Sequence, residues 1–302
     1  MKRARAAVVA ATALVLALTL GGCGSDESST EEISKPVDVG VAVPAQLKTQ
    51  GMIKVGVACD YPPFGYKDME GTNAGYDPEV ARALAAYAFG DSSKVAFTCV
   101  NPQNRIPYLN TKKIDLIIST LGYTLDRAEI IDYSAPYFRS GVKLLVPKDS
   151  TVNGWDDIKG ETITTKEGTT ASIFLKNCYP QSKQLLLTST SDAVAALKAD
   201  RAVTFAEDST LLLGLSLSDS SLKVIGEDKA ETPWGLGIRK GDSDTKKWVD
   251  AALADMQAQD TFWKIFTAQV TEKDAAEAFA ENMPRPEQDI TYTKQDTLTD
   301  CS

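Results

Sequence analysis

The sequence of 302 residues contains no histidine. This absence excludes Ser-His-Asp and Cys-His nucleophilic machinery, because both use an imidazole as the base. It also removes the commonest protein ligand of transition metals, and no pair among the five cysteines has metal-ligand spacing. We therefore expect no catalytic residue set, no metal site and no cofactor.

The chain also lacks an excess of basic residues. It has 32 Lys and Arg against 41 Asp and Glu, a net charge of −9. A chain this acidic repels phosphate backbones and anionic lipid headgroups, so we expect no nucleic-acid partner. Its length suits one large domain or two of ordinary size, and its 43% apolar residues are enough to build hydrophobic cores.

The longest apolar run is short and lies near the N-terminus. A basic start over residues 1–5 precedes an apolar run over residues 6–20, whereas a comfortable membrane span needs roughly 20 apolar residues. A basic start, a short apolar run and small residues are typical of a secretion signal, which we assign to residues 1–22.

The end of this run, Leu20-Gly21-Gly22-Cys23, resembles the lipobox of bacterial lipoproteins. The resemblance implies cleavage before Cys23 and a diacylglycerol and palmitate anchor on its thiol, so that only lipid enters the membrane. The protein would then lie on the outer face of the cytoplasmic membrane. Residues 24–47 lack periodicity, so residues 23–47 are expected to form a flexible lipidated tether with a reach of roughly 70–80 Å. An ordinary signal with a chance cysteine is the alternative.

Four further cysteines are Cys59, Cys99, Cys178 and Cys301. Outside the cytoplasm, disulfides are their natural state. Cys59 and Cys99 each end a short strand-like run, and neighbouring strands lie about 4.8 Å apart, which is within disulfide reach. We expect this pair on that ground, and Cys178 with Cys301 by elimination.

From Met52 onward, strand-like and helical patterns alternate. Such alternation predicts an α/β fold with parallel sheets that carry helices on both faces. The predicted strands are 53–58, 94–100, 114–119, 142–147, 162–165, 184–188 and 202–206, and the predicted helices are 78–89, 106–110, 125–130, 170–177, 192–198, 244–257 and 261–268.

The alternation restarts after residue 160, which indicates two lobes. Extended segments near 144–147 and 234–239 are expected to join them as two hinge crossings. Residues beyond Glu272 look extended and exposed. The expected parts of the folded chain are lobe 1 (48–146 plus 239–272), lobe 2 (147–238) and a C-terminal tail (273–302).

Ligands of α/β sheets bind beyond the carboxyl ends of the strands. One such end is the stretch CDYPPFGY (59–66), in which paired prolines prevent a helix and hold aromatic rings in a loop. Tyr61 is the best candidate to stack on a small ligand, although an aromatic residue here can also belong to the core.

A second strand end leads into STLGYTLDR (119–127). Thr124 is predicted to cap the next helix, which places Arg127 in its first turn. A cation in the first turn interacts unfavourably with the helix dipole, which costs several tenths of a kcal/mol of helix stability. The residues three and four positions from Arg127, which are its neighbours on a helix, include no acidic residue that could pair with it. The guanidinium fork matches a carboxylate, so we predict an anion site. The alternative is an arginine that reaches solvent or a distant acid.

Two more strand ends could complete the site. EGTTASIF (167–174) opens a helix with backbone N–H groups and threonine hydroxyls, and Asp208 follows a buried strand. Both features are also explained by helix capping. A zwitterionic ligand, however, needs a carboxylate for its ammonium as well as an arginine for its carboxylate, because burying either charge unpaired costs several kcal/mol.

In this order, the stretches VACDYPPFGY, NRIPYLNTKKIDLIIST, TLDRAEIIDYSAPY, EGTT and the strand end at Asp208 resemble family 3 of the bacterial extracellular solute-binding proteins. These are the amino-acid receptors of ABC importers, and the likeness runs from about residue 50 to residue 270. It implies the two-lobed type II fold of periplasmic binding proteins, in which the lobes close on the ligand. It also implies a protein that is not an enzyme and that delivers a free amino acid to an ABC permease.

The resemblance also implies the roles of individual residues. Arg127 would clamp the α-carboxylate, together with Thr120, the backbone of Gly122 and Thr170. Gly122 departs from the family, because many members have Ser or Thr there and only the backbone can contribute in this chain.

For the rest of the ligand, the resemblance implies that Asp208 takes the α-ammonium and that Tyr61 covers the side chain. Arg105 matches a position that reaches the side-chain carboxylate in receptors for acidic amino acids, and a surface arginine is the alternative. Asp60, near the side-chain pocket, favours an amide or a cation. We expect an acidic or amide amino acid and a monomeric protein.

Two other classes of function remain open from sequence. The same fold hosts a cyclohexadienyl dehydratase that acts on small carboxylated rings, although no acid–base pair stands out in this chain. The chain could also be the ligand-sensing subunit of a signalling complex, which would need a separate signalling partner.

Overall fold

The computed structural model describes residues 34–292 and 297–301. The chain divides into a unit of Met1–Glu32 and a unit of Ile33–Ser302, and the fold below is that of the second unit. The predicted secretion signal, Cys23 and the first part of the tether lie outside the described residues. In the described part of the chain, no helix combines the length and the apolar character that a bilayer crossing requires.

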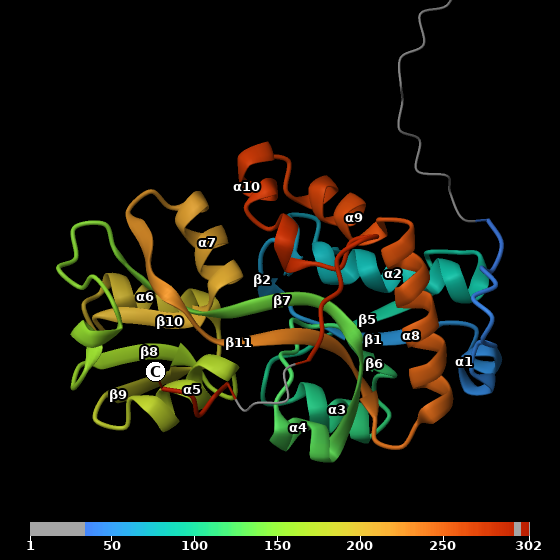
Figure 1. Ribbon diagram of the computed structural model, residues 1–302, viewed down its shortest axis with the longest axis horizontal. Helices are drawn as coiled ribbons and strands as arrows, with labels where there is room; N and C mark the ends of the chain where they lie inside the picture. The colour runs from blue at the N-terminus through green and yellow to red at the C-terminus, as the bar shows by residue number, and fades with distance from the viewer. Residues whose placement is uncertain (1–33, 293–296, 302) are drawn as a thin grey trace, which may run out of the picture. The chain divides into compact units, whose positions relative to one another are not determined.

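The centre of the fold is one eight-stranded sheet with the strand order β5-β1-β6-β11-β7-β10-β8-β9 (Figure 1). Strands β5, β1 and β6 are mutually parallel, as are β10, β8 and β9, and the two groups are joined by antiparallel pairs. The α/β prediction with mostly parallel strands is therefore confirmed. The strands of this sheet are β1 (Ile53–Val57), β5 (Val95–Cys99), β6 (Leu116–Ile117), β7 (Ile131–Pro147), β8 (Thr162–Lys166), β9 (Lys183–Leu187), β10 (Thr204–Asp208) and β11 (Leu222–Arg239).

Two long strands, β7 and β11, connect the two parallel groups. They pair with each other from Ile131↔Arg239 to Pro147↔Leu222. β7 also pairs with β10, while β11 pairs with β6 at the other end. The predicted crossing segments 144–147 and 234–239 both lie inside these strands.

Helices cover both faces of the sheet. On one face, α2, α6, α7, α8 and α9 bury side chains in a continuous core, and on the other face α3 and α5 pack over two separate cores. The helices are α1 (Ala45–Gln50), α2 (Tyr76–Phe89), α3 (Arg105–Asn110), α4 (Leu125–Ile130), α5 (Thr170–Cys178), α6 (Thr190–Lys198), α7 (Ser209–Ser218), α8 (Ser243–Ala258), α9 (Thr261–Gln269) and α10 (Lys273–Glu277), with 3-10 turns at Trp155–Ile158 and Ala280–Asn282.

A small three-stranded sheet precedes α2. It is formed by β2 (Asp60–Tyr61), β3 (Gly65–Lys67) and β4 (Asn73–Ala74), and it follows the first strand of the main sheet directly. Sequence reasoning expected an irregular loop here. The hairpin holds Asp60 and Tyr61 at the carboxyl end of β1.

Both predicted disulfides are confirmed. Cys59 bonds Cys99 with a Cα–Cα distance of 5.6 Å, at the ends of the paired strands β1 and β5. Cys178 bonds Cys301 with a Cα–Cα distance of 5.2 Å. The second bond attaches the C-terminal end of the chain to the end of α5 (Figure 1).

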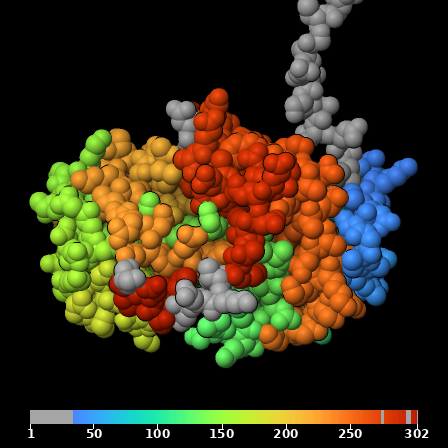
Figure 2. All heavy atoms as spheres, in the orientation of Figure 1, coloured from blue at the N-terminus to red at the C-terminus, as the bar shows by residue number. Residues whose placement is uncertain are grey.

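The expectation of an extended and exposed tail beyond Glu272 is wrong. Phe279 and Met283 are buried in the large core, and Leu298 is buried in the core beneath α5. The Tyr292 hydroxyl donates to the Ser134 carbonyl oxygen at 2.6 Å. Figure 2 shows the C-terminal segment, in red, packed on the surface in the middle of the view. Phe279, Met283 and Leu298 anchor this segment through their burial in the two cores.

Candidate functional site

A cavity lies where the carboxyl ends of the parallel strands meet. It contains about 470 Å³ of space not filled by atoms, part of it open to solvent. The structure places all seven residues predicted to bind the ligand on its wall, namely Tyr61, Arg105, Thr120, Gly122, Arg127, Thr170 and Asp208.

Arg127 enters the cavity from the first turn of α4. Its backbone N–H donates to the Thr124 hydroxyl at 3.2 Å, so the predicted cap is confirmed. The buried guanidinium donates from Nη1 to the Gly122 carbonyl oxygen at 2.8 Å and from Nη2 to the Gly168 carbonyl oxygen at 2.9 Å. Among the described residues, no carboxylate forms an ion pair with Arg127. The alternative of a solvent-exposed or acid-paired arginine does not hold.

Arg105 is a second buried arginine on the same wall. Its Nη1 donates to the Ser119 carbonyl oxygen at 2.6 Å, while its Nε is buried without a partner among the described residues. Burial, and then the charge of Arg127, lower the pKa of Arg105 to about 9. Two neighbouring guanidinium groups raise the positive potential here, so an anion in this part of the cavity is stabilised by both.

The loop before α4 is held in an unusual conformation. Thr120 has a φ of 44°, in the left-handed region that a β-branched residue rarely adopts. Its N–H donates to Asp77 Oδ2 at 3.0 Å, and the Tyr137 hydroxyl donates to Asp77 Oδ1 at 2.7 Å. Burial raises the pKa of Asp77 to about 7. Sequence reasoning missed Asp77, whose place in the first turn of α2 looks like an ordinary dipole contact.

The surroundings of Gly122 leave little space for a side chain. A Cβ there would lie 2.8 Å from Thr232 Oγ1 and 3.0 Å from Thr170 Cγ2. Its carbonyl oxygen accepts hydrogen bonds from Arg127 and from the Tyr133 hydroxyl, and its N–H donates to the Thr120 carbonyl oxygen at 3.1 Å. A serine or threonine would therefore force the side chains of Thr232 and Thr170 to shift.

Asp208 ends β10 and caps α7, so the capping interpretation is correct and the residue also lines the cavity. Its Oδ1 accepts three hydrogen bonds, from Ser140 Oγ at 2.5 Å and from the Thr210 N–H and hydroxyl at 3.0 and 2.6 Å. Burial raises the pKa of Asp208 to about 6, and the Ser140 and Thr210 hydrogen bonds oppose that rise. All of these bonds end on one oxygen, which leaves Oδ2 for another donor.

Asp60 and Lys166 form an ion pair on the wall of the cavity. Asp60 Oδ2 lies 3.4 Å from Lys166 Nζ and accepts hydrogen bonds from the Thr190 N–H and hydroxyl at 3.0 and 3.2 Å. The Lys166 ammonium is buried and lies 5.4 Å from the centre of the Tyr61 ring. Sequence reasoning missed Lys166, although a lysine at the end of a buried strand, in TTKEGTT, is a usable signal.

Glu207 is a further buried carboxyl group on the cavity wall. It is 3% exposed, and its Oε2 has no hydrogen-bond partner among the described residues. Burial raises the pKa of Glu207 to about 7, against the opposing charge of Lys166. Sequence reasoning missed it because position 207 in a strand predicts only a side chain directed into the core.

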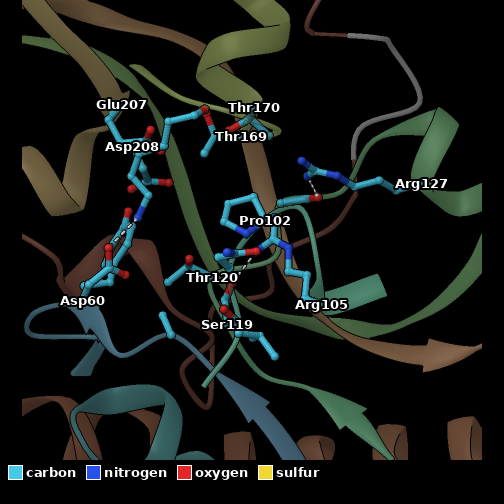
Figure 3. Close-up of a pocket in the computed structure, with 16 residues that line it drawn as sticks. Asp60, Pro102, Arg105, Ser119, Thr120, Arg127, Thr169, Thr170, Glu207 and Asp208 are labelled. Carbon is cyan, nitrogen blue, oxygen red and sulfur yellow. Dashed lines mark hydrogen bonds and ion pairs between the residues drawn. The ribbon is translucent and has the colours of Figure 1, made fainter. Parts of the chain in front are cut away.

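The charges of the wall are balanced and separated. Figure 3 shows the two arginines on one side of the cavity and the carboxyl residues on the other. A small zwitterion with its carboxylate toward the arginines fits this distribution, because each of its charges meets the opposite sign. The charged wall residues are Arg105, Arg127, Lys166, Asp60, Glu207 and Asp208.

Comparisons with known proteins identify the family of this chain. The family described as bacterial extracellular solute-binding proteins, family 3, matches residues 53–269. A glutamine-binding protein of Geobacillus stearothermophilus is 34% identical over 238 residues, which cover 77% of this chain and 91% of that protein. The ABC transporter glutamine-binding protein GlnH of Bacillus subtilis is 27% identical over 271 residues, 89% of this chain and 97% of that protein.

Solved structures with a similar fold are also known. A solute receptor for L-cysteine from Neisseria gonorrhoeae superimposes with a TM-score of 0.73 at 31% identity, covering 75% of this chain and 92% of that one. This likeness confirms the predicted type II fold of periplasmic binding proteins.

Proposed function

This chain belongs to family 3 of the bacterial extracellular solute-binding proteins, and we propose that it binds L-glutamine and delivers it to an ABC importer. Its relatives are named as binding proteins of amino acids and not as enzymes, which supports a receptor. The observation that carries the choice of glutamine is the Asp60–Lys166 pair inside the cavity.

The carboxylate of the ligand binds on the arginine side. Arg127 uses two of the five N–H donors of its guanidinium for carbonyl oxygens, and the group remains on the cavity wall. Thr170, at the start of the nine-residue helix α5, adds a hydroxyl and the positive end of the helix dipole. Arg105, on the same side of the cavity as Arg127, strengthens the positive potential. We leave the Gly122 N–H out of this set, since Thr120 already accepts it.

The side-chain amide binds between Asp60 and Lys166. A primary amide has an N–H₂ group that donates and a carbonyl oxygen that accepts, and the pair offers one group of each kind. The three bonds to Asp60 end on Oδ2, which leaves Oδ1 for the amide N–H₂. A glutamate carboxylate would lie against Asp60, and a cationic side chain would lie against Lys166. The amide is the neutral partner that satisfies both.

Closure of two lobes around the ligand is the motion that we propose. Contacts between the expected lobes support it, because the Arg127 guanidinium donates to the Gly168 carbonyl oxygen and Asp60 accepts the Thr190 N–H. The cavity is formed by both sides of these contacts. The proposed lobes are 48–146 plus 239–272 and 147–238. Described residues of the C-terminal segment contact both, because Tyr292 donates to Ser134 and Cys301 bonds Cys178.

We also propose that a lipid on Cys23 holds the receptor outside the cytoplasmic membrane. The lipobox-like end of the apolar run supports this proposal. The receptor is then tethered to the membrane that contains its permease, and it acts as a monomer. Mass spectrometry of the protein extracted from membranes tests this, since a diacylglyceryl thioether on Cys23 is expected and an unmodified N-terminus before residue 23 contradicts it.

A thermal-shift screen of the twenty amino acids tests the function. A ligand at about 1,000 times its Kd stabilises the folded state by about 4 kcal/mol, which raises Tm by roughly 8–16 °C for a protein near this size. We expect that rise with L-glutamine, and its loss in Arg127→Ala. The matched control is Arg201→Ala, which removes an exposed arginine that does not line the cavity. No shift with any amino acid contradicts the proposed function.

A further inference from the structure

Glu207 is a charged residue of the cavity wall to which the proposed function gives no role. It lies at the carboxyl end of β10, immediately before Asp208. It is 3% exposed, and its Oε2 is buried without a hydrogen-bond partner among the described residues. Leaving such an oxygen unpaired is costly, so a buried carboxyl group on a ligand cavity indicates a donor supplied by the ligand or a proton of its own.

The groups that face Glu207 come from several elements. Lys166 is the cation that affects Glu207 most. Its charge lowers the pKa of Glu207 and is the largest influence against the rise that burial causes. Lys143, its register partner on β7, is engaged with Asp228 at 3.2 Å. The charged and titratable groups that interact electrostatically with Glu207 are Lys166 of β8, Asp208 of β10, Tyr61 of β2 and Arg105 of α3.

The α-ammonium of an amino acid needs more than Asp208. An ammonium has three N–H donors, as a lysine side chain does. Asp208 Oδ1 already accepts three hydrogen bonds from Ser140 and Thr210, so one oxygen of this carboxylate remains. The adjacent residue on the same wall is Glu207, with an oxygen that lacks a donor.

We propose that Glu207 is a second acceptor for the α-ammonium of the ligand, that it carries a proton in the free protein, and that it releases this proton when the ligand binds. The inference rests on the proposed function, because it requires a ligand with an ammonium group. The step is an ordinary ionisation, in which the Glu207 carboxyl loses its proton to the solvent and the carboxylate then pairs with the ammonium.

The electrostatics support this exchange. Burial raises the pKa of Glu207 to about 7, and the charge of Asp208 adds to the rise. A bound ammonium favours the ionised carboxylate and therefore lowers that pKa. Because the bound pKa is below the free pKa, affinity falls as pH decreases below about 7, by up to about tenfold per pH unit, and it levels off as pH rises to about 8.

Isothermal titration calorimetry with L-glutamine measures the released proton. Titrations in phosphate and in imidazole, which have different ionisation enthalpies, give the number of protons per ligand. We expect release of about 0.5 proton near pH 7 and only about 0.1 proton near pH 8, which is below the pH at which Arg105 and the α-ammonium of the ligand lose their protons. Glu207→Gln should abolish this release near pH 7 and bind more weakly at pH 8. Glu161→Gln, an exposed glutamate at the start of β8, should behave as the unmodified protein.

Two other carboxyl groups titrate in the same range, so the variants separate them. Asp208 has a pKa of about 6 and Asp77 of about 7. Asp77 does not line the cavity and is held by Tyr137 and Thr120, so Asp77→Asn should keep the proton release. Unchanged release in Glu207→Gln, or no release in the unmodified protein, overturns the inference.

Failure of the inference is distinct from failure of the proposed function. If L-glutamine binds without proton release, the inference is wrong and the receptor function stands. If another amino acid binds in place of L-glutamine, the same titration with that amino acid tests Glu207, because every α-amino acid has the ammonium. If none binds, both are refuted.

Discussion

Replacement of Asp60 by asparagine tests how the cavity selects its ligand by the side chain. Asp60 lies 3.4 Å from Lys166, and its Oδ1 is not used in hydrogen bonds with described residues. In the proposed complex this oxygen accepts the amide N–H₂ of glutamine. Asp60→Asn keeps the size of the side chain and removes its charge, so the effect on ligand choice is separated from an effect on packing.

The magnitude follows from the geometry of the pair. A glutamate γ-carboxylate about 4 Å from Asp60 meets a repulsion of about 4 kcal/mol at an effective dielectric constant of about 20. Attraction to Lys166 is of similar size, so these two charge effects largely cancel. The hydrogen bond does not cancel, because glutamine donates to Asp60 and glutamate cannot. A charge-assisted hydrogen bond contributes about 1.5–3 kcal/mol, or roughly 10- to 150-fold in affinity.

Calorimetric titration of both amino acids gives the ratio of their Kd values. The unmodified protein should prefer glutamine by at least about tenfold. In Asp60→Asn, glutamine should weaken, glutamate should strengthen because only Lys166 remains, and the ratio should fall to about one or invert. The control Glu70→Gln removes an exposed acid from the β3–β4 turn and should leave the ratio unchanged. An unchanged ratio in Asp60→Asn refutes the assignment of the amide to this pair.

Three further predictions concern two other residues of the site and the stability of the fold. Arg127→Ala should weaken amino-acid binding by about 2–5 kcal/mol in calorimetry, and a loss below tenfold would contradict the carboxylate clamp. Gly122→Ser should also weaken binding, because its Cβ would lie 2.8 Å from Thr232 Oγ1, and unaltered affinity would contradict that steric argument. Replacing Cys178 and Cys301 together by serine should lower the free energy of unfolding in urea by about 2–4 kcal/mol, and an unchanged midpoint would show that this bond does not stabilise the chain.

The regular α/β elements were predictable from sequence because their burial is periodic. Helix α4 was expected at 125–130 and begins and ends there, since Thr124 gives a clear cap. The bounds of strand β1 were also predicted to within one residue, because its residues are buried first alternately and then successively. The first half of β7 was missed because Ser, Pro and Tyr residues interrupt the apolar pattern, and its partner β11 only becomes a strand through pairing with it.

The candidate site was predictable where a local signal existed. Arg127 violated the usual chemistry of a helix start, and Asp208 followed a buried strand. Lys166, Glu207 and Asp77 have roles that depend on distant neighbours, such as the Asp60–Lys166 approach between residues 106 positions apart. No window of sequence contains that information. The tail was misjudged for the same reason, because Phe279 and Met283 find their core only in three dimensions.

A crystal structure of the protein grown with L-glutamine tests the central claim most directly. We expect one glutamine in the cavity, with its carboxylate on Arg127, its ammonium on Asp208 and its amide between Asp60 and Lys166. Density for the ligand in the opposite orientation, with its carboxylate toward Asp208, or no glutamine in the cavity at saturating concentration, would contradict the account.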